Sequence, residues 1–203
     1  MTNLKSEVII QYNLQHRDAH MKIDIVTGDI TALTVDCIVN AANPALAAGA
    51  GVCGAIFKAA GASLMVKYIE RIYWHGCPTG SAVITPSFQM YPAIKNIIHA
   101  VGPDCRIYTD KQLAKQLLEM TYLTAMNVAM EHGMKSIAFP LISGGIYGYD
   151  PREAAIVAVR AVKSCKGVYD LTEHKTTYPD VTFCAFDKTT ADMYTEAQYN
   201  FTH

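Results

Sequence analysis

The sequence predicts an α/β fold, a three-layer α/β/α sandwich with a central mixed, mostly parallel sheet. Short apolar runs rich in Val, Ile and Phe alternate with helical patterns along the chain, which is the order typical of this class. Several of these runs are apolar throughout, as expected for strands covered on both faces. The chain has 203 residues, of which 51% are hydrophobic, so it can form one large domain with a substantial core.

Six strands and three helices follow from these patterns. The expected strands are residues 22–26, 35–39, 81–85, 96–101, 136–140 and 181–186. The expected helices are residues 112–131, 151–163 and 189–199. The second helix has a marked start, because Asp150 is a good N-cap, Pro151 suits the first turn and Glu153 completes a capping box. Residues 168–180 are expected to form a loop.

The main domain is predicted to span residues 21–203. Residues 1–20 are polar and poorly patterned, and they form an N-terminal extension that is either an extra edge strand near residues 7–12 or a loose arm. The first residues lack the apolar core and the small-residue cleavage pattern of a signal peptide. No apolar run reaches the roughly 18 residues that a membrane span needs. These features predict a cytoplasmic protein without a membrane partner.

Charge and cysteine usage exclude several function classes. Charged residues make up 17% of the chain and the net charge is −1, which argues against nucleic acid as a partner. The six cysteines are spread along the chain without a C-x-x-C pair, so reduced thiols are expected. His75 and Cys77 lie close in sequence, but no second pair at metal-ligand spacing accompanies them. A zinc site is therefore not expected, and the sequence is expected to function without a metal or a cofactor.

Two glycine-rich segments each join an apolar strand to a helix. The first, at 39–56, reads VNAANPALAAGAGVCGAI, and the second, at 143–153, reads SGGIYGYDPRE. Small residues allow close approach of backbone to a ligand, and N–H groups at a helix start attract phosphate. Ligands of open α/β sheets bind at the carboxyl ends of strands, where both segments lie. The two loops are thus suited to hold a diphosphate from opposite sides.

Each motif also has a plainer interpretation. The string GAGVCG at 49–54 matches the dinucleotide pattern G-x-G-x-x-G, but the turn with Asn43 and Pro44 separates it from its strand, which disfavours a Rossmann site. Asn40 and Asn43 are also ordinary turn residues beside proline. Asp29 is suited simply to capping a short turn or helix. The segment from Ser143 is also compatible with a structural turn.

Taken together, the motifs resemble the macro domain, the module that binds ADP-ribose. The resemblance covers residues 21–199 and is closest to the group of bacterial ADP-ribosyl hydrolases and O-acetyl-ADP-ribose deacetylases, while viral macro domains share part of the pattern. The matching motifs, in order, are VTGDIT at 26–31, VNAANPAL at 39–46, GAGVCGAIFKAAG at 49–61, CPTGSAVIT at 77–85, IIHAVGP at 97–103 and FPLISGGIYGYD at 139–150.

The resemblance implies roles for particular residues. Asp29 would accept a hydrogen bond from the adenine amino group, with Ile30 nearby, and Phe186 would pack on the adenine face. Asn43 would hold the distal ribose, and Tyr147 would pack against it. The remaining ligand-binding residues are those of the first phosphate loop, of the second phosphate loop and of the strand end that braces the first: Gly51, Val52 and Cys53; Ser143, Gly144, Gly145, Ile146 and Tyr147; and Asn40.

One departure bears on catalysis. Many hydrolases of this group have aspartate where this chain has Cys53, and that aspartate is assigned to positioning or activating water. A neutral thiol cannot act as a carboxylate does, and no base is evident that would make it a nucleophile. The implied catalytic residues are Asn43, Tyr147 and Cys53. The expected function is hydrolysis of O-acetyl-ADP-ribose or of mono-ADP-ribosylated protein; the alternatives are a non-catalytic reader of ADP-ribosylated proteins and, more remotely, a nucleotide-dependent oxidoreductase.

Overall fold

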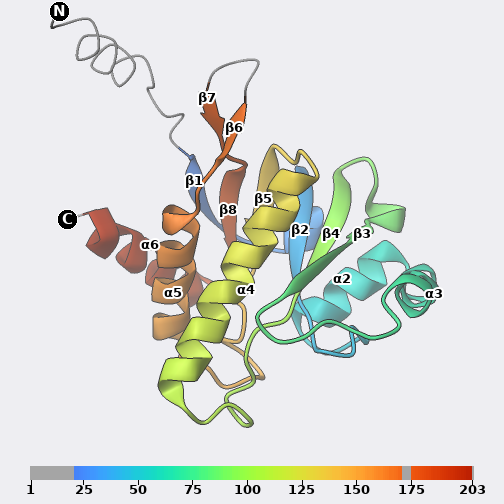
Figure 1. Cartoon of the computed structure of the whole chain (residues 1–203), viewed down its shortest axis with the longest axis horizontal. Coiled ribbons are helices and arrows are strands. Elements are labelled where there is room, and N and C mark those ends of the chain that lie inside the picture. Colours follow the sequence, from blue (N-terminus) through green and yellow to red (C-terminus); the bar gives the residue numbers. More distant parts are fainter. Residues whose placement is uncertain (1–20, 171–174, 203) are drawn as a thin grey trace, which may run out of the picture.

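A six-stranded sheet forms the centre of the molecule (Figure 1). The computed structural model describes residues 21–170 and 175–202. The strands are β1 (Ile23–Thr27), β2 (Val35–Ala41), β3 (Ala82–Pro86), β4 (Ile94–Ala100), β5 (Ser136–Phe139) and β8 (Asp180–Ala185). Their order is β1-β8-β5-β2-β4-β3, and every pair is parallel except β3 with β4. The mixed, mostly parallel sheet is confirmed, and each predicted strand lies within two residues of its observed bounds.

Helices cover both faces of this sheet, as predicted. One face carries α4 (Lys111–Glu131), α5 (Pro151–Ser164) and α6 (Lys188–Thr202), and the other carries the short η1 (Ile30–Ala32) with α2 (Val52–Ala60) and α3 (Ala62–Ile72). A further short helix, η2 (Phe88–Met90), follows β3. Alternate residues of β2 enter different cores: Cys37 and Val39 pack with the first set of helices and Ile38 with the second. Burial on both faces explains why the strands are apolar throughout.

Helix boundaries follow the expected local signals. The Asp150 side chain accepts a hydrogen bond from the backbone N–H of Glu153 at 2.9 Å, and Pro151 opens α5. Helix α3 was not predicted. It begins immediately after Gly61, whose φ of 83° turns the chain through 98° between α2 and α3. Such a left-handed conformation favours glycine, so this glycine is the signal that separates the two helices.

The prediction of a loop at residues 168–180 is wrong. Two three-residue strands, β6 (Val168–Asp170) and β7 (Lys175–Thr177), pair antiparallel outside the main sheet, and β8 already begins at Asp180. Strands of three residues are too short for an alternating pattern to appear in the sequence. The extension at residues 1–20, with the edge strand considered near residues 7–12, lies outside the described residues.

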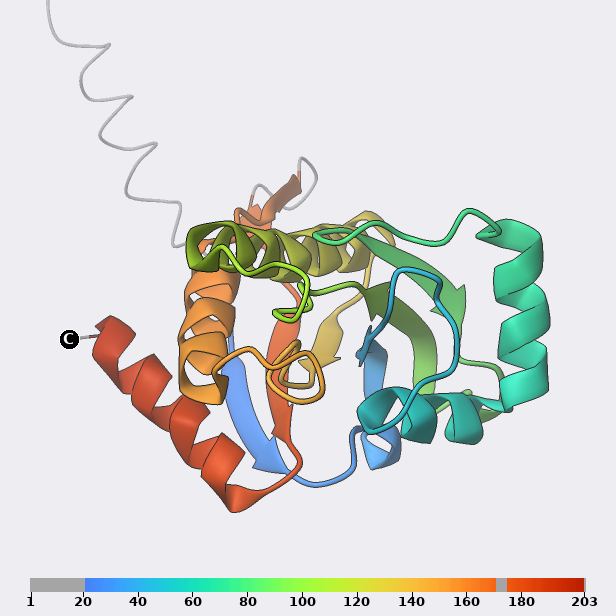
Figure 2. The same cartoon turned by 90° about the horizontal axis from the view of Figure 1, so that it is seen from below.

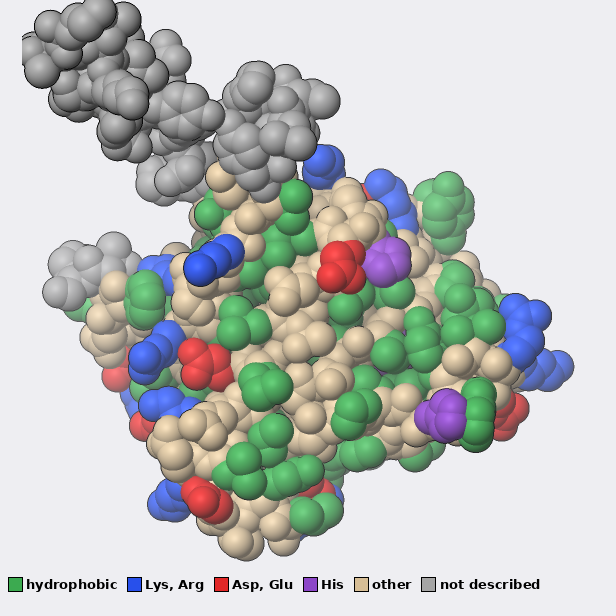
Figure 3. Space-filling model, in the orientation of Figure 1, with side chains coloured by type: hydrophobic (Ala, Val, Ile, Leu, Met, Phe, Trp, Pro, Cys, Tyr) green, Lys and Arg blue, Asp and Glu red, His purple; other side chains and the backbone are tan. Residues whose placement is uncertain are grey.

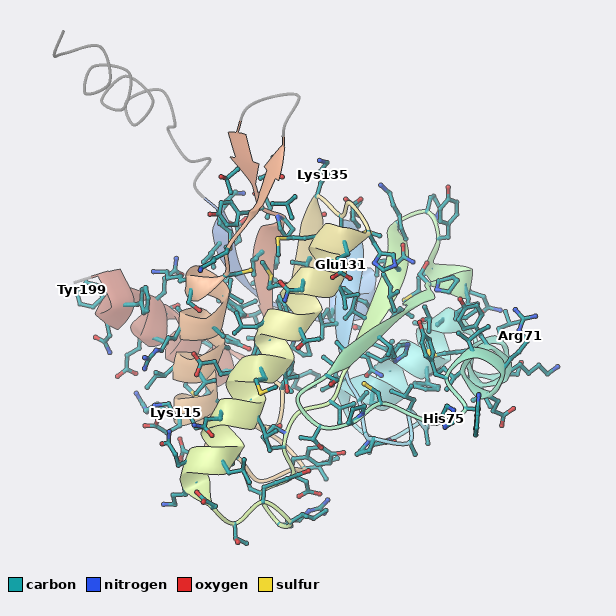
Figure 4. The ribbon with its side chains drawn as sticks, viewed as in Figure 1. Arg71, His75, Lys115, Glu131, Lys135 and Tyr199 are labelled. Atoms are coloured by element: carbon teal, nitrogen blue, oxygen red, sulfur yellow. The ribbon has the colours of Figure 1, made fainter. Side chains whose placement is uncertain are left out.

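The visible surface carries acidic and basic side chains interspersed among apolar and neutral ones (Figure 3). The charged side chains labelled in Figure 4, such as Arg71, Lys115 and Lys135, point away from the sheet. In the described ranges no single helix has the length and apolar character of a membrane span; only α2 and α3 taken together meet that test, and they are bent by 98°.

Candidate functional site

A cavity of about 270 Å³ lies at the carboxyl ends of β2, β4 and β5. Figure 2 views this end of the sheet, where the loop after β2 and the loop after β5 both emerge. The cavity is lined by Ala41, Ala42, Asn43, Gly49, Ala50, Gly51, Val52, Cys53, Gly102, Leu141, Ile142, Ser143, Gly145, Ile146 and Tyr147. The two glycine-rich segments, about a hundred residues apart in sequence, therefore face each other across one cavity.

Asn43 organises the loop after β2. Its side chain donates from Nδ2 to the carbonyl of Ala47 at 2.7 Å and accepts from the N–H of the same residue at 3.1 Å. Within the loop Leu46 adopts a φ of 55°, a conformation that costs a non-glycine residue roughly 1–3 kcal/mol. Leu46 is buried, and its packing holds this strained turn in place. The loop is thus fixed from both sides, by a side-chain clamp and by a buried anchor.

Cys53 lies at the first turn of α2, against this loop. Its side chain is buried, and its Sγ donates weakly to the carbonyl of Ala47 at 3.8 Å. Burial raises the pKa of the Cys53 thiol, and this outweighs the opposing hydrogen bonds of the Gly49 backbone and the Asn40 side chain. The sulfur therefore stays protonated at neutral pH, which argues against a thiolate nucleophile.

Both loops that line the cavity have backbone N–H groups without a backbone partner. The N-cap of α2 is Gly51, which has no side chain to accept a bond from the first N–H groups of the helix. Within the described part of the chain, none of the N–H groups of residues 50–54 or of residues 143–147 donates to another backbone group. Free N–H groups of this kind, arranged around a hollow, are able to bind anions. The described residues that line the cavity include no lysine or arginine, so the backbone itself supplies the positive potential.

The loop after β5 contains one strained residue and is held by buried contacts. Ser143 adopts a φ of 63°, and its buried hydroxyl has no hydrogen-bond partner among the described residues. The space for that hydroxyl exists because residue 102 is glycine: a Cβ on Gly102 would lie 2.3 Å from the Ser143 Oγ. From α4, the Tyr122 hydroxyl accepts from the N–H of Ile142 at 3.1 Å and donates to the carbonyl of Pro140 at 3.3 Å. Tyr122, which was not predicted, thereby fixes the loop's first residues.

Tyr147 stands at the far side of this loop with a basic residue above it. The Arg106 guanidinium lies 5.9 Å from the centre of the Tyr147 ring, and the Asp104 carboxylate holds it through two hydrogen bonds of 2.6 and 2.8 Å. The N–H of Cys105 donates to the carbonyl of Tyr147 at 2.8 Å. Burial, and secondarily the Asp104 charge, raises the pKa of Tyr147, so its hydroxyl is a neutral donor.

Asn40 does not reach the cavity. It is 1% exposed, and its Nδ2 bonds the Nδ1 of His99 at 3.0 Å in the interior. Its predicted bracing role is compatible with this position, whereas direct contact with a ligand is not. His99 was not predicted as a site residue. The signal was present in the sequence, as a histidine in the otherwise apolar strand IIHAV at 97–101.

The residues predicted to hold adenine lie together but outside the cavity. Strands β1 and β8 are neighbours, with Thr27 opposite Ala185, and this pairing brings Asp29 and Phe186 to the same edge of the sheet. Phe186 is 90% exposed. Asp29 is exposed and caps η1, accepting at Oδ1 from the N–H and the hydroxyl of Thr31. Ile30 is buried beneath this edge, and Gly144 packs on Leu141 rather than lining the cavity.

The model of the macro domain family matches residues 39–158, more than half of the chain and including both loops. The chain belongs to the macro domain family. Its relatives include an O-acetyl-ADP-ribose deacetylase of Escherichia coli, 41% identical over 174 residues that cover 85% of this chain and 93% of that protein. A macro domain-containing protein of Ralstonia nicotianae is 43% identical over 169 residues, covering 83% and 90%.

Solved macrodomain structures share the fold. The Oceanobacillus iheyensis macrodomain with ADP matches with a TM-score of 0.76 and 33% identity, covering 92% of this chain and 94% of that one. The Trypanosoma brucei macrodomain in complex with ADP-ribose matches with a TM-score of 0.71 and 28% identity, covering 86% and 68%. The family and the fold expected from the sequence motifs are therefore confirmed. No group of three or more His, Cys, Asp or Glu suited to a metal occurs in the described portion of this macro domain.

Proposed function

We propose that this macro domain binds ADP-ribose and hydrolyses a carboxylic ester of its distal ribose. The observation that carries the proposal is that two loops with unpaired N–H groups line one cavity, whose lining includes no lysine or arginine. A diphosphate between the two loops would accept hydrogen bonds from both. An array of backbone donors suits a fixed phosphate geometry and requires no side-chain reorganisation.

The layout of the sheet supports one orientation of the ligand. Asp29 and Phe186 follow β1 and β8, the second loop follows β5 and the first follows β2, in that spatial order. Adjacent strands are roughly 5 Å apart, so the distance across these strands suits an extended dinucleotide-like ligand. The cavity of about 270 Å³ is below the roughly 300–1,000 Å³ of pockets that enclose a whole ligand of drug size. It suits the diphosphate and distal ribose, with adenine on the exposed edge.

Relatives support the substrate class. Several are named O-acetyl-ADP-ribose deacetylases, and the match to this chain spans more than nine tenths of each of them. The macrodomains of Oceanobacillus iheyensis and Trypanosoma brucei are described with ADP or ADP-ribose. We extend this substrate class to O-acetyl-ADP-ribose and to protein carrying mono-ADP-ribose on an acidic side chain, because both are esters of a ribose hydroxyl.

In the proposed reaction, water attacks and the ester C–O bond breaks. The carboxylic acid leaves as its carboxylate, the ribose recovers its hydroxyl, and one proton is released to solvent. Asn43 would orient the ribose, and Tyr147 would hold the acylated end near the water. Positioning of this kind lowers a barrier without a protein base. The Cys53 thiol is protonated and takes no covalent part.

A second function, non-catalytic recognition of ADP-ribosylated protein, is favoured by one observation. Cys53 places a neutral thiol in the cavity where the resembling hydrolases have a carboxylate. If water positioning depends on that carboxylate, the domain binds its ligand and releases it unchanged. The two functions share a binding site and differ only in turnover.

Titration calorimetry with ADP-ribose, followed by an assay of acetate or protein release, tests both functions. We expect binding and turnover. Absence of binding at about millimolar ligand would contradict the ADP-ribose site, since a Kd of that size corresponds to a binding free energy of only about −4 kcal/mol. Binding without turnover on either ester would leave the reader function.

A further inference from the structure

Three polar side chains, Asn40, His99 and Thr85, form a buried hydrogen-bonded row across neighbouring strands behind the first loop. Asn40 on β2 bonds His99 on β4 at 3.0 Å, and His99 bonds Thr85 on β3 at 3.0 Å. Their exposed fractions are at most 1%. Asn40 and His99 are register partners in the parallel pairing of β2 with β4. Apolar residues surround this row, with the Phe57 ring of α2 packed edge-on against the His99 ring.

The hydrogen bonds of this row have only one consistent assignment of donors and acceptors. The Asn40 Nδ2 donates, so the Nδ1 of His99 accepts and its Nε2 carries the hydrogen. The Nε2–H then donates to Thr85 Oγ1, whose own hydrogen goes to the carbonyl of Pro86 at 3.0 Å. Burial lowers the pKa of His99 to about 4, which keeps the ring neutral. A neutral ring is required here, because an imidazolium has no acceptor for the amide N–H.

The Asn40 end of this row has an unused acceptor. The Asn40 Oδ1 is buried without a partner among the described residues. A hydrogen bond from the Asn40 amide lowers the pKa of the Cys53 thiol, against the larger effect of burial. That sulfur contacts the carbonyl of Ala47, the same atom that Asn43 clamps. A rotation of the amide by 180° would place the Oδ1 where the N–H₂ group now faces His99 and the sulfur. The bond to His99 prevents this rotation.

We propose that His99 is a positioning residue for the hydrolysis: it fixes the Asn40 amide, and Asn40 in turn sets the geometry of the loop that carries Asn43. The inference rests on the proposed hydrolase function. His99 does not contact the ligand and transfers no proton. Its contribution is one acceptor atom at Nδ1, held by the second bond at Nε2.

Two substitutions separate positioning from mere packing. His99→Asn retains an acceptor near the position of Nδ1 but removes most of the ring. His99→Gln fills more of the ring volume and places its amide near Nε2, so the acceptor for Asn40 is lost. A packing role makes His99→Asn the more damaging change, because it leaves the larger cavity. A positioning role reverses that order for turnover.

The experiment measures kcat, KM and Tm for wild type and both variants on O-acetyl-ADP-ribose, and ADP-ribose affinity by calorimetry. For His99→Gln we expect kcat to fall by about tenfold or more, with affinity within about threefold, because misplacement of a distant group chiefly affects the chemical step. For His99→Asn we expect the lower Tm but the higher kcat. Thr124→Val is the control: it removes the bond from Thr124 to the carbonyl of Gly80, remote from the loop, and affects Tm only.

Three outcomes would contradict these expectations. If kcat follows Tm across the variants, His99 is a packing residue and the inference fails while the hydrolase function stands. The same conclusion follows if both variants keep wild-type kcat. If wild type itself shows no turnover, the proposed hydrolase function fails, and the positioning role of His99 fails because it depends on that function.

Discussion

The proposed site has one end enclosed by the protein and one end that is open. At the distal end Asn43, Cys53 and Tyr147 surround a cavity, and the Asn43 clamp and the buried Tyr122 hydroxyl hold the loops around it. At the adenine end Asp29 and Phe186 lie on the surface, with Phe186 90% exposed. The end proposed for the reaction is braced by the protein itself, whereas the end proposed for the base has its side chains exposed. Preorganisation of this kind reduces the cost of binding where geometry matters most.

The largest expected effect is at the enclosed end. Asn43→Ala removes the proposed ribose contact and the clamp on Ala47, so we expect turnover to fall by about a hundredfold, or about 2.7 kcal/mol in the barrier, while ADP-ribose still binds. Steady-state kinetics and calorimetry measure the two effects. Asp29→Ala is the matched control, and it should affect binding more than kcat. Equal turnover in wild type and Asn43→Ala would remove the distal loop from the mechanism.

The burial of His99 behind this end predicts a pH dependence of the free energy of unfolding. The folded-state pKa of His99, about 4, is below its ordinary value of 6.5, so the unfolded chain binds a proton more readily. The contribution of neutral His99 is fully present above about pH 6.5 and is lost as pH falls toward 4. Between pH 8 and pH 5 the loss is about 2 kcal/mol in the free energy of unfolding. Urea titration across this range measures it, and His99→Gln should flatten the dependence; an unchanged slope would show that the ring is solvated.

At the open end the expected effect is smaller. Asp29→Ala removes a charged acceptor for the adenine amino group, and affinity for ADP-ribose should fall by about tenfold. Ribose 5-phosphate lacks adenine, so its affinity should be nearly unchanged. Calorimetry with both ligands makes the comparison. An equal loss for both would mean that Asp29 acts by capping η1 rather than by contacting the base.

The smallest effect is expected at Cys53. Because burial keeps the thiol protonated, Cys53→Ala should retain turnover within about threefold, and Cys53→Asp should raise it if the restored carboxylate can position water. The wild-type rate should also show no rise between pH 6 and 8 that tracks thiolate formation. Loss of turnover in Cys53→Ala would identify the sulfur as the catalytic group.

Some parts of this structure could be predicted from the sequence and others could not. The strands could be predicted because burial on both faces makes each run apolar, and Asp150 marked its helix start through cap chemistry that is local in sequence. The two glycine-rich loops could be recognised from their glycines and their strand ends. The β6–β7 hairpin could not, since three residues do not establish a period.

The braces of the site depend on contacts between distant residues. Asn43 appeared in the sequence only as a ribose contact, but its clamp on Ala47 depends on how the loop folds back. Tyr122 lies in the middle of α4, where a tyrosine at helical spacing indicates only packing, and its bonds to Pro140 and Ile142 arise from tertiary structure. Asn40 and His99 are 59 residues apart, and only the pairing of β2 with β4 brings them together.

The central claim, that the cavity between the two loops holds the distal half of ADP-ribose, is tested most directly by comparing two ligands on the wild-type protein. ADP-ribose and ADP share the adenine end and the diphosphate, and they differ in the distal ribose. Calorimetry should show tighter binding of ADP-ribose, and Asn43→Ala should reduce that difference while leaving ADP affinity unchanged. Equal affinity of wild type for both ligands, or an equal loss for both in Asn43→Ala, would contradict the assignment of the enclosed cavity to the distal ribose.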